Sequence, residues 1–143
     1  MVNKMLGCVS NQLYDTFGGD YTYYKENVEQ GLTKPCFTID CLLPLQRSRS
    51  RYYYDRTIPV VVHYFSNDKK DTKQDCYDKA EQIVEALEYV PYENTLIRGE
   101  GISWQIVDDV LQVFVTYGFI TQKITSNEDS MEVVEQTTTT VIK

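Results

Sequence analysis

The chain has 143 residues, of which 42% are hydrophobic and 13% are aromatic. This length fits one domain with its own core, and the apolar content excludes a wholly disordered chain. The formal net charge of -7 argues against a protein whose main role is to hold nucleic acid, because such binding relies on lysine and arginine to neutralise phosphates.

The sequence indicates a cytoplasmic protein with no membrane partner. No run approaches the roughly 20 apolar residues that cross a bilayer. The N-terminal segment has only a short, interrupted apolar run and does not resemble a signal peptide, so we expect the chain to be made in the cytoplasm and to stay there. Reduced cysteines among apolar neighbours behave as small buried hydrophobes, and we expect no structural disulfide among Cys8, Cys36, Cys41 and Cys76.

Apolar residues at helical spacing predict a first amphipathic helix over residues 2–17. Gly18 and Gly19 follow it as a C-terminal stop. The apolar stripe of this helix consists of Val2, Leu6, Val9, Leu13 and Phe17.

Three strands are expected next, over residues 21–28, 36–43 and 52–65. The last is rich in β-branched and aromatic residues, which is typical of a strand buried on both faces. Pro59 marks the start of that strand or a bulge in it. We interpret the segment Arg47–Arg51, which precedes it, as a loop or a strand-connecting arm.

A second helix is predicted after the polar loop 66–71. Thr72 and Asp75 resemble a capping box at its start, and Pro91 would end it. Its apolar residues recur at helical spacing, at Cys76, Ala80, Ile83, Val84, Leu87 and Val90.

The last predicted unit is a meander of strands. A short strand at 96–98 precedes a strand at 102–107, and Asp108-Asp109 forms the turn into a long return strand at 110–124. Beyond residue 125 the composition becomes acidic and threonine-rich. We therefore expect one domain over residues 1–125 and a loose C-terminal tail over residues 126–143.

Together these elements predict an α+β fold in the order α-β-β-β-α-β-β-β. Both helices can lay their apolar stripes on one face of a single mixed, mostly antiparallel sheet. The other face or an edge strand is then left uncovered, which favours assembly with other subunits.

Templates for catalysis and for metal binding do not fit this sequence. His63 is the single histidine and lies in an apolar strand pattern, which favours a structural role over that of a general base. Cys36 and Cys41 are an odd number of residues apart on one predicted strand, so they would point to opposite faces and not share a zinc ion. Asp108 and Asp109 fit a hairpin turn better than a pair of reactive carboxylates. We expect no enzyme activity, no metal and no cofactor.

One segment mixes arginine with tyrosine and favours a binding role. Such mixtures occur in binding sites for single-stranded nucleic acid and in protein–protein hot spots. The acidic net charge and the lack of a second basic cluster favour a protein interface, in which the segment could dock on an acidic stretch of a neighbouring subunit. That stretch could be the one with Glu128, Asp129, Glu132 and Glu135. The residues of the Arg/Tyr segment are Arg47, Arg49, Arg51, Tyr52, Tyr53, Tyr54 and Arg56.

Several stretches, in the same order and with similar spacing, resemble a tail terminator family of phages and of phage-derived contractile tails of Gram-positive bacteria. The resemblance covers residues 5 to 124. It rests on the stretch from Val28 to Ile39, on Arg51-Tyr52-Tyr53, on Val62-His63-Tyr64-Phe65, on Leu87-Glu88 and on the hairpin from Val107 to Val115.

This resemblance implies a ring-forming subunit, usually a hexamer, with an α+β fold and no catalytic residues. Such a ring caps the finished tail tube, stops its polymerisation and presents a surface to head-completion proteins or to the last sheath ring. It implies a place in a virion or a phage-tail-like particle that is assembled in the bacterial cytoplasm. The long aromatic strands 21–28 and 110–124, the latter with Tyr117, and the nearby Trp104 are further candidates for contacts within the ring.

Two alternatives remain open from the sequence. One is another head–tail joining protein of the same neck. The other, from a different class, is a small nucleic-acid-binding protein that uses the Arg/Tyr segment, and its binding would fall steeply with salt.

Overall fold

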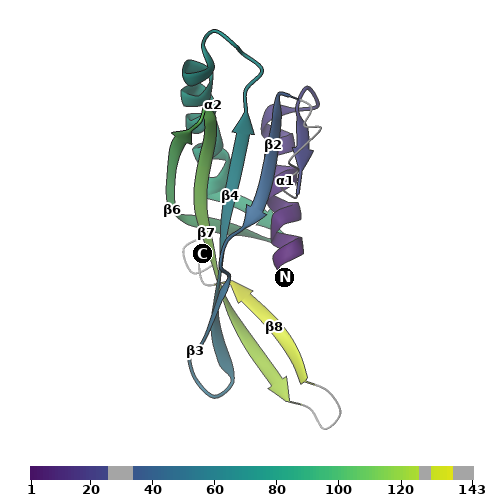
Figure 1. Cartoon of the computed structure of the whole chain (residues 1–143). Helices are drawn as coiled ribbons and strands as arrows, with labels where there is room; N and C mark the ends of the chain where they lie inside the picture. Colours follow the sequence, from purple (N-terminus) through teal and green to yellow (C-terminus); the bar gives the residue numbers. More distant parts are fainter. Residues whose placement is uncertain (26–33, 126–129, 137–143) are drawn as a thin grey trace.

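Two amphipathic helices lie on one face of a mostly antiparallel sheet in the computed structural model, which describes residues 1–25, 34–125 and 130–136 (Figure 1). Helix α1 spans Val2–Phe17 and helix α2 spans Thr72–Glu88, close to the predicted bounds. Their apolar stripes enter one core, as their 3.6-residue periodicity predicts. The buried stripe of α1 is Met5, Leu6, Val9 and Leu13, and that of α2 is Cys76, Ala80, Ile83, Ala86 and Leu87.

The sheet has eight strands in the described part of the chain, and its main path runs β1-β2-β4-β7-β6-β5. Strand β3 also pairs with β4, and β8 also pairs with β7. Strands β1 and β2 are parallel, and the other pairs are antiparallel. The strands are β1 (Thr22–Tyr24), β2 (Cys36–Cys41), β3 (Leu45–Ser48), β4 (Tyr53–Phe65), β5 (Tyr89–Tyr92), β6 (Thr95–Val107), β7 (Val110–Thr125) and β8 (Ser130–Gln136).

These findings confirm the predicted α+β class and correct the number of strands. Three strands were not expected: β3, from a segment interpreted as a loop or arm, β5, from the predicted end of the second helix, and β8, from the predicted tail. The expectation of a loose tail therefore does not hold for Ser130–Gln136. Residues 126–129, the four threonines at 137–140 and the end of the strand predicted at 21–28 lie outside the described residues.

The long strands β4 and β7 join two parts of the molecule. They pair from Tyr53↔Gln122 to Phe65↔Val110. One half of this ladder is flanked by β2 and β6 and covered by the helices, whereas the other half is flanked by β3 and β8. The second half projects beyond the helices as a four-stranded extension (Figure 1). We call it the arm: strand β3, residues 53–57 of β4, residues 118–125 of β7, and strand β8. The two helices and the rest of the sheet form the body.

Pro59 lies inside β4, where the body meets the arm, and not at the start of the strand. Its carbonyl accepts a hydrogen bond from the backbone N–H of Leu42 at 2.9 Å. Because the N–H and C=O of a strand residue point to the same side, the nitrogen of Pro59, which carries no hydrogen, faces the same neighbour. That neighbour is the segment between β2 and β3, where the ladder is already interrupted. Proline therefore costs β4 no hydrogen bond with β7.

Alternation along β4 and β7 sets the core face of the sheet. The core side chains come from every second residue of each strand, as expected when one face of a strand is covered. They are Ile58, Val60, Val62 and Tyr64 of β4, and Leu111, Val113, Val115, Tyr117 and Phe119 of β7. On the opposite face of β4, Val61 is also buried, which agrees in part with the expectation of burial on both faces.

The two short strands predicted at 96–98 and 102–107 form one bent strand, β6. Its register with β7 shifts between Glu100 and Ser103, and Gly101 adopts a φ of 60° in this bulge. Glycine accepts that conformation without the steric penalty that a side chain would bring. The turn at Asp108 and Asp109 is confirmed, with φ of 51° and 61°, as a two-residue hairpin turn requires.

Two details at the ends of α2 differ from the prediction. Asp71 is the N-cap, and the capping box is wrong because Thr72 donates to the carbonyl of Asp68, while the Asp75 carboxylate is engaged elsewhere. The helix ends at Glu88, and Val90 is buried as part of β5 instead of the helix.

Candidate assembly surface

The Arg/Tyr segment forms the outer hairpin of the arm. Strand β3 pairs with β4 from Leu45↔Thr57 to Ser48↔Tyr54, and residues 49–52 make the turn. The backbone N–H groups of Arg49 and Ser50 both donate to the carbonyl of Tyr53, at 2.9 and 3.2 Å, and close this turn. The structure thus brings most of the predicted interface residues together at the end of the molecule farthest from the α2 N-terminus (Figure 1).

Alternation within the hairpin divides these residues among two faces and a tip. Tyr54 and Arg56 share one face of the arm, whereas Arg47 and Tyr53 share the other. At the tip, the guanidinium of Arg51 lies 5.4 Å from the ring centre of Tyr52, which is 46% exposed. An exposed cation–aromatic pair of this kind offers a partner both charge and apolar area.

Polar contacts within the hairpin involve two arginines of the cluster. Arg49 lies 3.7 Å from the carboxylate of Asp55, and both side chains are about half exposed, so the pair contributes little to stability. The Nε of Arg56 donates to the side-chain oxygen of Gln46 at 2.6 Å. These contacts orient two of the four arginines without burying them.

Trp104 and Tyr117 do not belong to the arm cluster. Trp104 is on β6, is 38% exposed, and packs edge-on against Tyr77 of α2 with ring centres 5.7 Å apart. This pair forms a separate exposed aromatic patch on the body. Tyr117 is fully buried, and its hydroxyl donates to the carbonyl of Leu87 at 2.9 Å. Burial raises the pKa of Tyr117, so it stays a neutral hydrogen-bond donor in the core and presents no surface to a partner.

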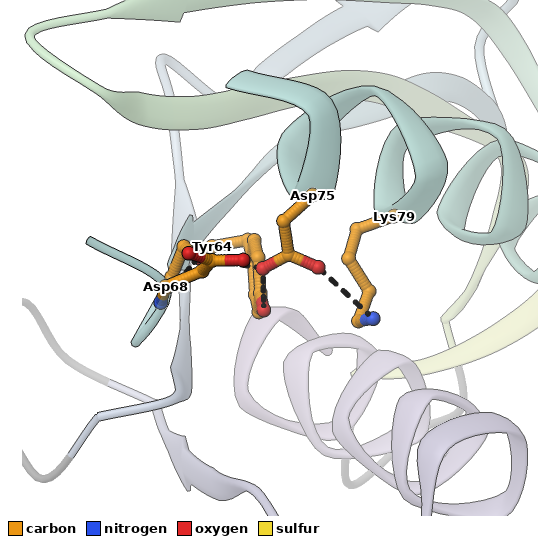
Figure 2. Close-up of polar contacts among 5 residues, drawn as sticks. Tyr64, Asp68, Asp75 and Lys79 are labelled. Atoms are coloured by element: carbon orange, nitrogen blue, oxygen red, sulfur yellow. Dashed lines mark hydrogen bonds and ion pairs between the residues drawn. The ribbon is translucent and has the colours of Figure 1, made fainter. Parts of the chain in front are cut away.

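A polar cluster that sequence reasoning missed joins the end of β4 to the start of α2. The Asp75 carboxylate accepts hydrogen bonds from the hydroxyls of Tyr64 at 2.7 Å and Ser66 at 2.6 Å, and lies 3.5 Å from the Lys79 ammonium (Figure 2). Burial raises the pKa of Tyr64, which therefore remains a donor. In the sequence, the available signal for this cluster was Asp75, an acidic residue on a helix with apolar neighbours. Its partners Tyr64 and Ser66 lie outside that helix, so the sequence pattern did not connect them. This cluster fastens the helix to the sheet.

Asp75 is expected to make stability depend on pH at the acid end. Burial favours the protonated form, but hydrogen bonds from Ser66 and Tyr64 and the nearby Lys79 hold the pKa of Asp75 below its ordinary value of 3.8. Because the folded-state pKa is the lower one, this stabilisation is present above about pH 4 and is lost as pH falls through the lowered pKa. Asp75→Ala should therefore cost about 1–3 kcal/mol in chemical denaturation at pH 7 and flatten the acid dependence.

The matched control is Asp78→Ala, which removes an exposed carboxylate from the same helix. It should change stability by less than about 0.5 kcal/mol and keep the acid dependence. Equal losses for the two variants would contradict the role given to Asp75.

The histidine, serine and cysteine side chains that were considered for catalysis or metal binding lie in packed or hydrogen-bonded positions within the fold. Burial lowers the pKa of His63, and the Ser66 hydroxyl donates to Asp75 instead of pairing with this histidine. Cys36 and Cys76 are buried free thiols. No group of three or more metal-ligating side chains gathers within residues 1–25, 34–125 and 130–136. Neither helix of this described part is both long enough and apolar enough to cross a membrane.

Comparison with known proteins identifies the family. The model of a phage tail terminator protein family matches residues 5–130, which is most of the chain. No curated protein matches the chain. The match covers most of α1, all of α2 and strands β1 to β7, including the hairpin that carries the Arg/Tyr segment. The chain belongs to the phage tail terminator protein family, and it is a structural protein of a phage tail.

Proposed function

We propose that this chain forms a closed ring of identical subunits, six as the resemblance implies, that sits on the end of a tail tube and stops its growth. A tube grows because each ring exposes the same heterologous surface that the next ring needs. A terminator must match that surface on one side and present a different one on the other. Its partners are then the tail tube protein on one side and a sheath, head-completion or neck protein on the other.

The observation that supports this proposal is the arm. It projects from the helix-covered body and carries the Arg/Tyr cluster, most of which is exposed, and arginine and tyrosine are enriched at protein–protein hot spots. Edge strands on such an extension offer backbone groups to a neighbouring chain. The Trp104–Tyr77 patch on the body is a second candidate contact, and we leave the buried Tyr117 out of the interface.

Electron microscopy of the purified chain, alone and with polymerising tail tube protein, tests this proposal. We expect rings at one end of each tube and tubes that stop lengthening when the chain is added. A control with bovine serum albumin at the same concentration should leave tube length unchanged. A persistent monomer that leaves tubes growing would overturn the proposal.

Measuring the binding of a single-stranded DNA oligonucleotide at low and high salt distinguishes the proposed ring function from the nucleic-acid-binding alternative. Asp55 lies beside Arg49 in the cluster, and its negative charge opposes phosphate binding. We therefore expect that the chain does not show the tight binding to the oligonucleotide, falling steeply with salt, that the nucleic-acid alternative requires. Tight, salt-dependent binding without ring formation would assign the Arg/Tyr segment to nucleic acid instead.

A further inference from the structure

The arm has two outer sheet edges. Strand β3 pairs with β4 on its inner side, and β8 pairs with β7 on its inner side. No strand in the described ranges of the chain pairs with the outer side of either. Exposed edges of this kind are templates for pairing with another chain.

The hydrogen-bond pattern tells which backbone groups face outward. The N–H of Arg49 donates to the carbonyl of Tyr53 across the hairpin, and inward bonds recur at every second residue of an antiparallel ladder. Gln46 and Ser48 therefore direct their backbone N–H and C=O groups outward. The same alternation, carried through the registers of β4, β7 and β8, makes Glu132 and Val134 outward-facing positions on β8.

Strand directions in the arm permit a continuous sheet between rotated copies. Each strand of the order β3-β4-β7-β8 runs antiparallel to the next, so the two edge strands run in opposite directions. Rotation about a ring axis along the strands keeps these directions. The β8 edge of one copy then meets the β3 edge of its neighbour in antiparallel orientation, which is a heterologous contact that can close into a ring.

Charge and register favour a second copy as the occupant of these edges. Strand β3 carries Arg47, whereas the sequence of β8 carries Glu132 and Glu135 and no basic residue. The registers Arg47↔Asp55, Asp55↔Ile120 and Ile120↔Glu135 place positions 47 and 135 level with each other on the same face of the arm. Opposite charges at adjacent positions across a strand junction stabilise it.

We propose that β3 of each subunit pairs antiparallel with β8 of the next, so that the arms of the ring join into one closed β-barrel. This inference rests on the proposed ring and adds how its subunits are joined. The barrel leaves no free edge on the arms, which is how closed barrels avoid uncontrolled pairing.

Disulfide crosslinking tests which edges meet. The registers place position 134 level with Ser48, and both face outward, so cysteines there would have Cα atoms about 5.5 Å apart, within disulfide range. The variant Ser48→Cys/Val134→Cys, with Cys8 and Cys41 changed to serine, should form a ladder of covalent oligomers that ends at the full ring. Ser48→Cys/Glu132→Cys tests a register shifted by two residues.

Single-cysteine variants are the matched controls. Neither Ser48→Cys nor Val134→Cys alone should crosslink, but an equal mixture of the two should give dimers. Covalent dimers of Ser48→Cys alone would show that two β3 edges meet and would overturn the heterologous junction. Rings with no crosslink in either double variant would overturn this inference and leave the proposed function standing. A chain that forms no rings would overturn both.

Proline substitution tests the backbone bond itself. Gln46→Pro removes an outward N–H without removing a bond to β4, whereas Gln46→Ala loses the same side chain and keeps that N–H. We expect Gln46→Pro to raise the protein concentration for half-assembly, measured by analytical ultracentrifugation, by about tenfold or more over Gln46→Ala. Circular dichroism should show both variants folded. Equal assembly of the two variants would show that the β3 edge forms no such bond.

Discussion

Replacing Arg49 and Arg51 with glutamate is expected to raise the concentration needed for ring assembly by about 100-fold or more. Both residues lie in the turn at the tip of the arm, and Arg51 lies over the ring of Tyr52. Reversing their charge removes the cation–aromatic contact and would place like charges against the acidic stretch of the neighbouring subunit that we propose as the partner. A 100-fold change corresponds to about 3 kcal/mol, which is typical of an interface hot spot. Analytical ultracentrifugation and electron microscopy measure it.

The fold should survive this change. The Arg49–Asp55 pair is about half exposed on both sides, and exposed substitutions usually alter stability by less than about 0.5 kcal/mol. The matched control is Lys69→Glu with Lys70→Glu, which makes the same change in charge on the exposed loop before α2, at the opposite end of the molecule (Figure 1). Unimpaired assembly of the arginine variant, or equal loss in both, would exclude a specific role for the tip.

Gly99→Ala is expected to be the most destabilising small substitution in the body, with a cost of about 3 kcal/mol. Gly99 lies on β6 beside Tyr117 of β7. A Cβ at this position would lie 2.5 Å from Cγ2 of Val115 and 2.6 Å from the carbonyl oxygen of Leu87. That carbonyl also accepts a hydrogen bond from the buried hydroxyl of Tyr117, so the backbone at Leu87 has little freedom to move away. Overpacking of a dense core commonly costs about 1–3 kcal/mol.

Urea denaturation of Gly99→Ala and Gly19→Ala measures this difference. A Cβ at Gly19 would meet only the Tyr14 hydroxyl, at an ordinary contact distance of 3.6 Å. The control should therefore stay within about 0.5 kcal/mol of the parent chain. If the two variants were equally stable, the close packing of α2, β6 and β7 around Gly99 would be disproved.

The sequence by itself predicted the elements whose signals are local. Helix periodicity indicated α1 and α2, and β-branched runs indicated β2, β4 and β7 with bounds within a few residues. The turn at Asp108 and Asp109 followed from its place between two alternating runs. These signals need no tertiary information, because burial of one face imposes a period of 3.6 or 2 on the residues themselves. The α+β class followed from the order of those elements.

Tertiary structure decided the partners of each element and the roles that depend on them. Asp75 follows Thr72 by three residues, as a capping box requires, but Asp71 is the N-cap, and the hydroxyls of Tyr64 and Ser66 donate to the Asp75 carboxylate. From the sequence, Tyr117 was a candidate for the interface. However, β7 lies at the centre of the sheet, and its odd-numbered residues, Tyr117 among them, fill the core.

The arm is the clearest case of this division. Its arginines and tyrosines were visible as a cluster in the sequence, whereas β3 and β8 became strands only because β4 and β7 extend beyond the helices and offer them edges to pair with. Short polar strands have little preference of their own for extended structure, since hydrogen bonds to a neighbouring strand stabilise them. Local periodicity thus determined the helices and the central strands, and long-range pairing determined the surface on which the proposed assembly depends.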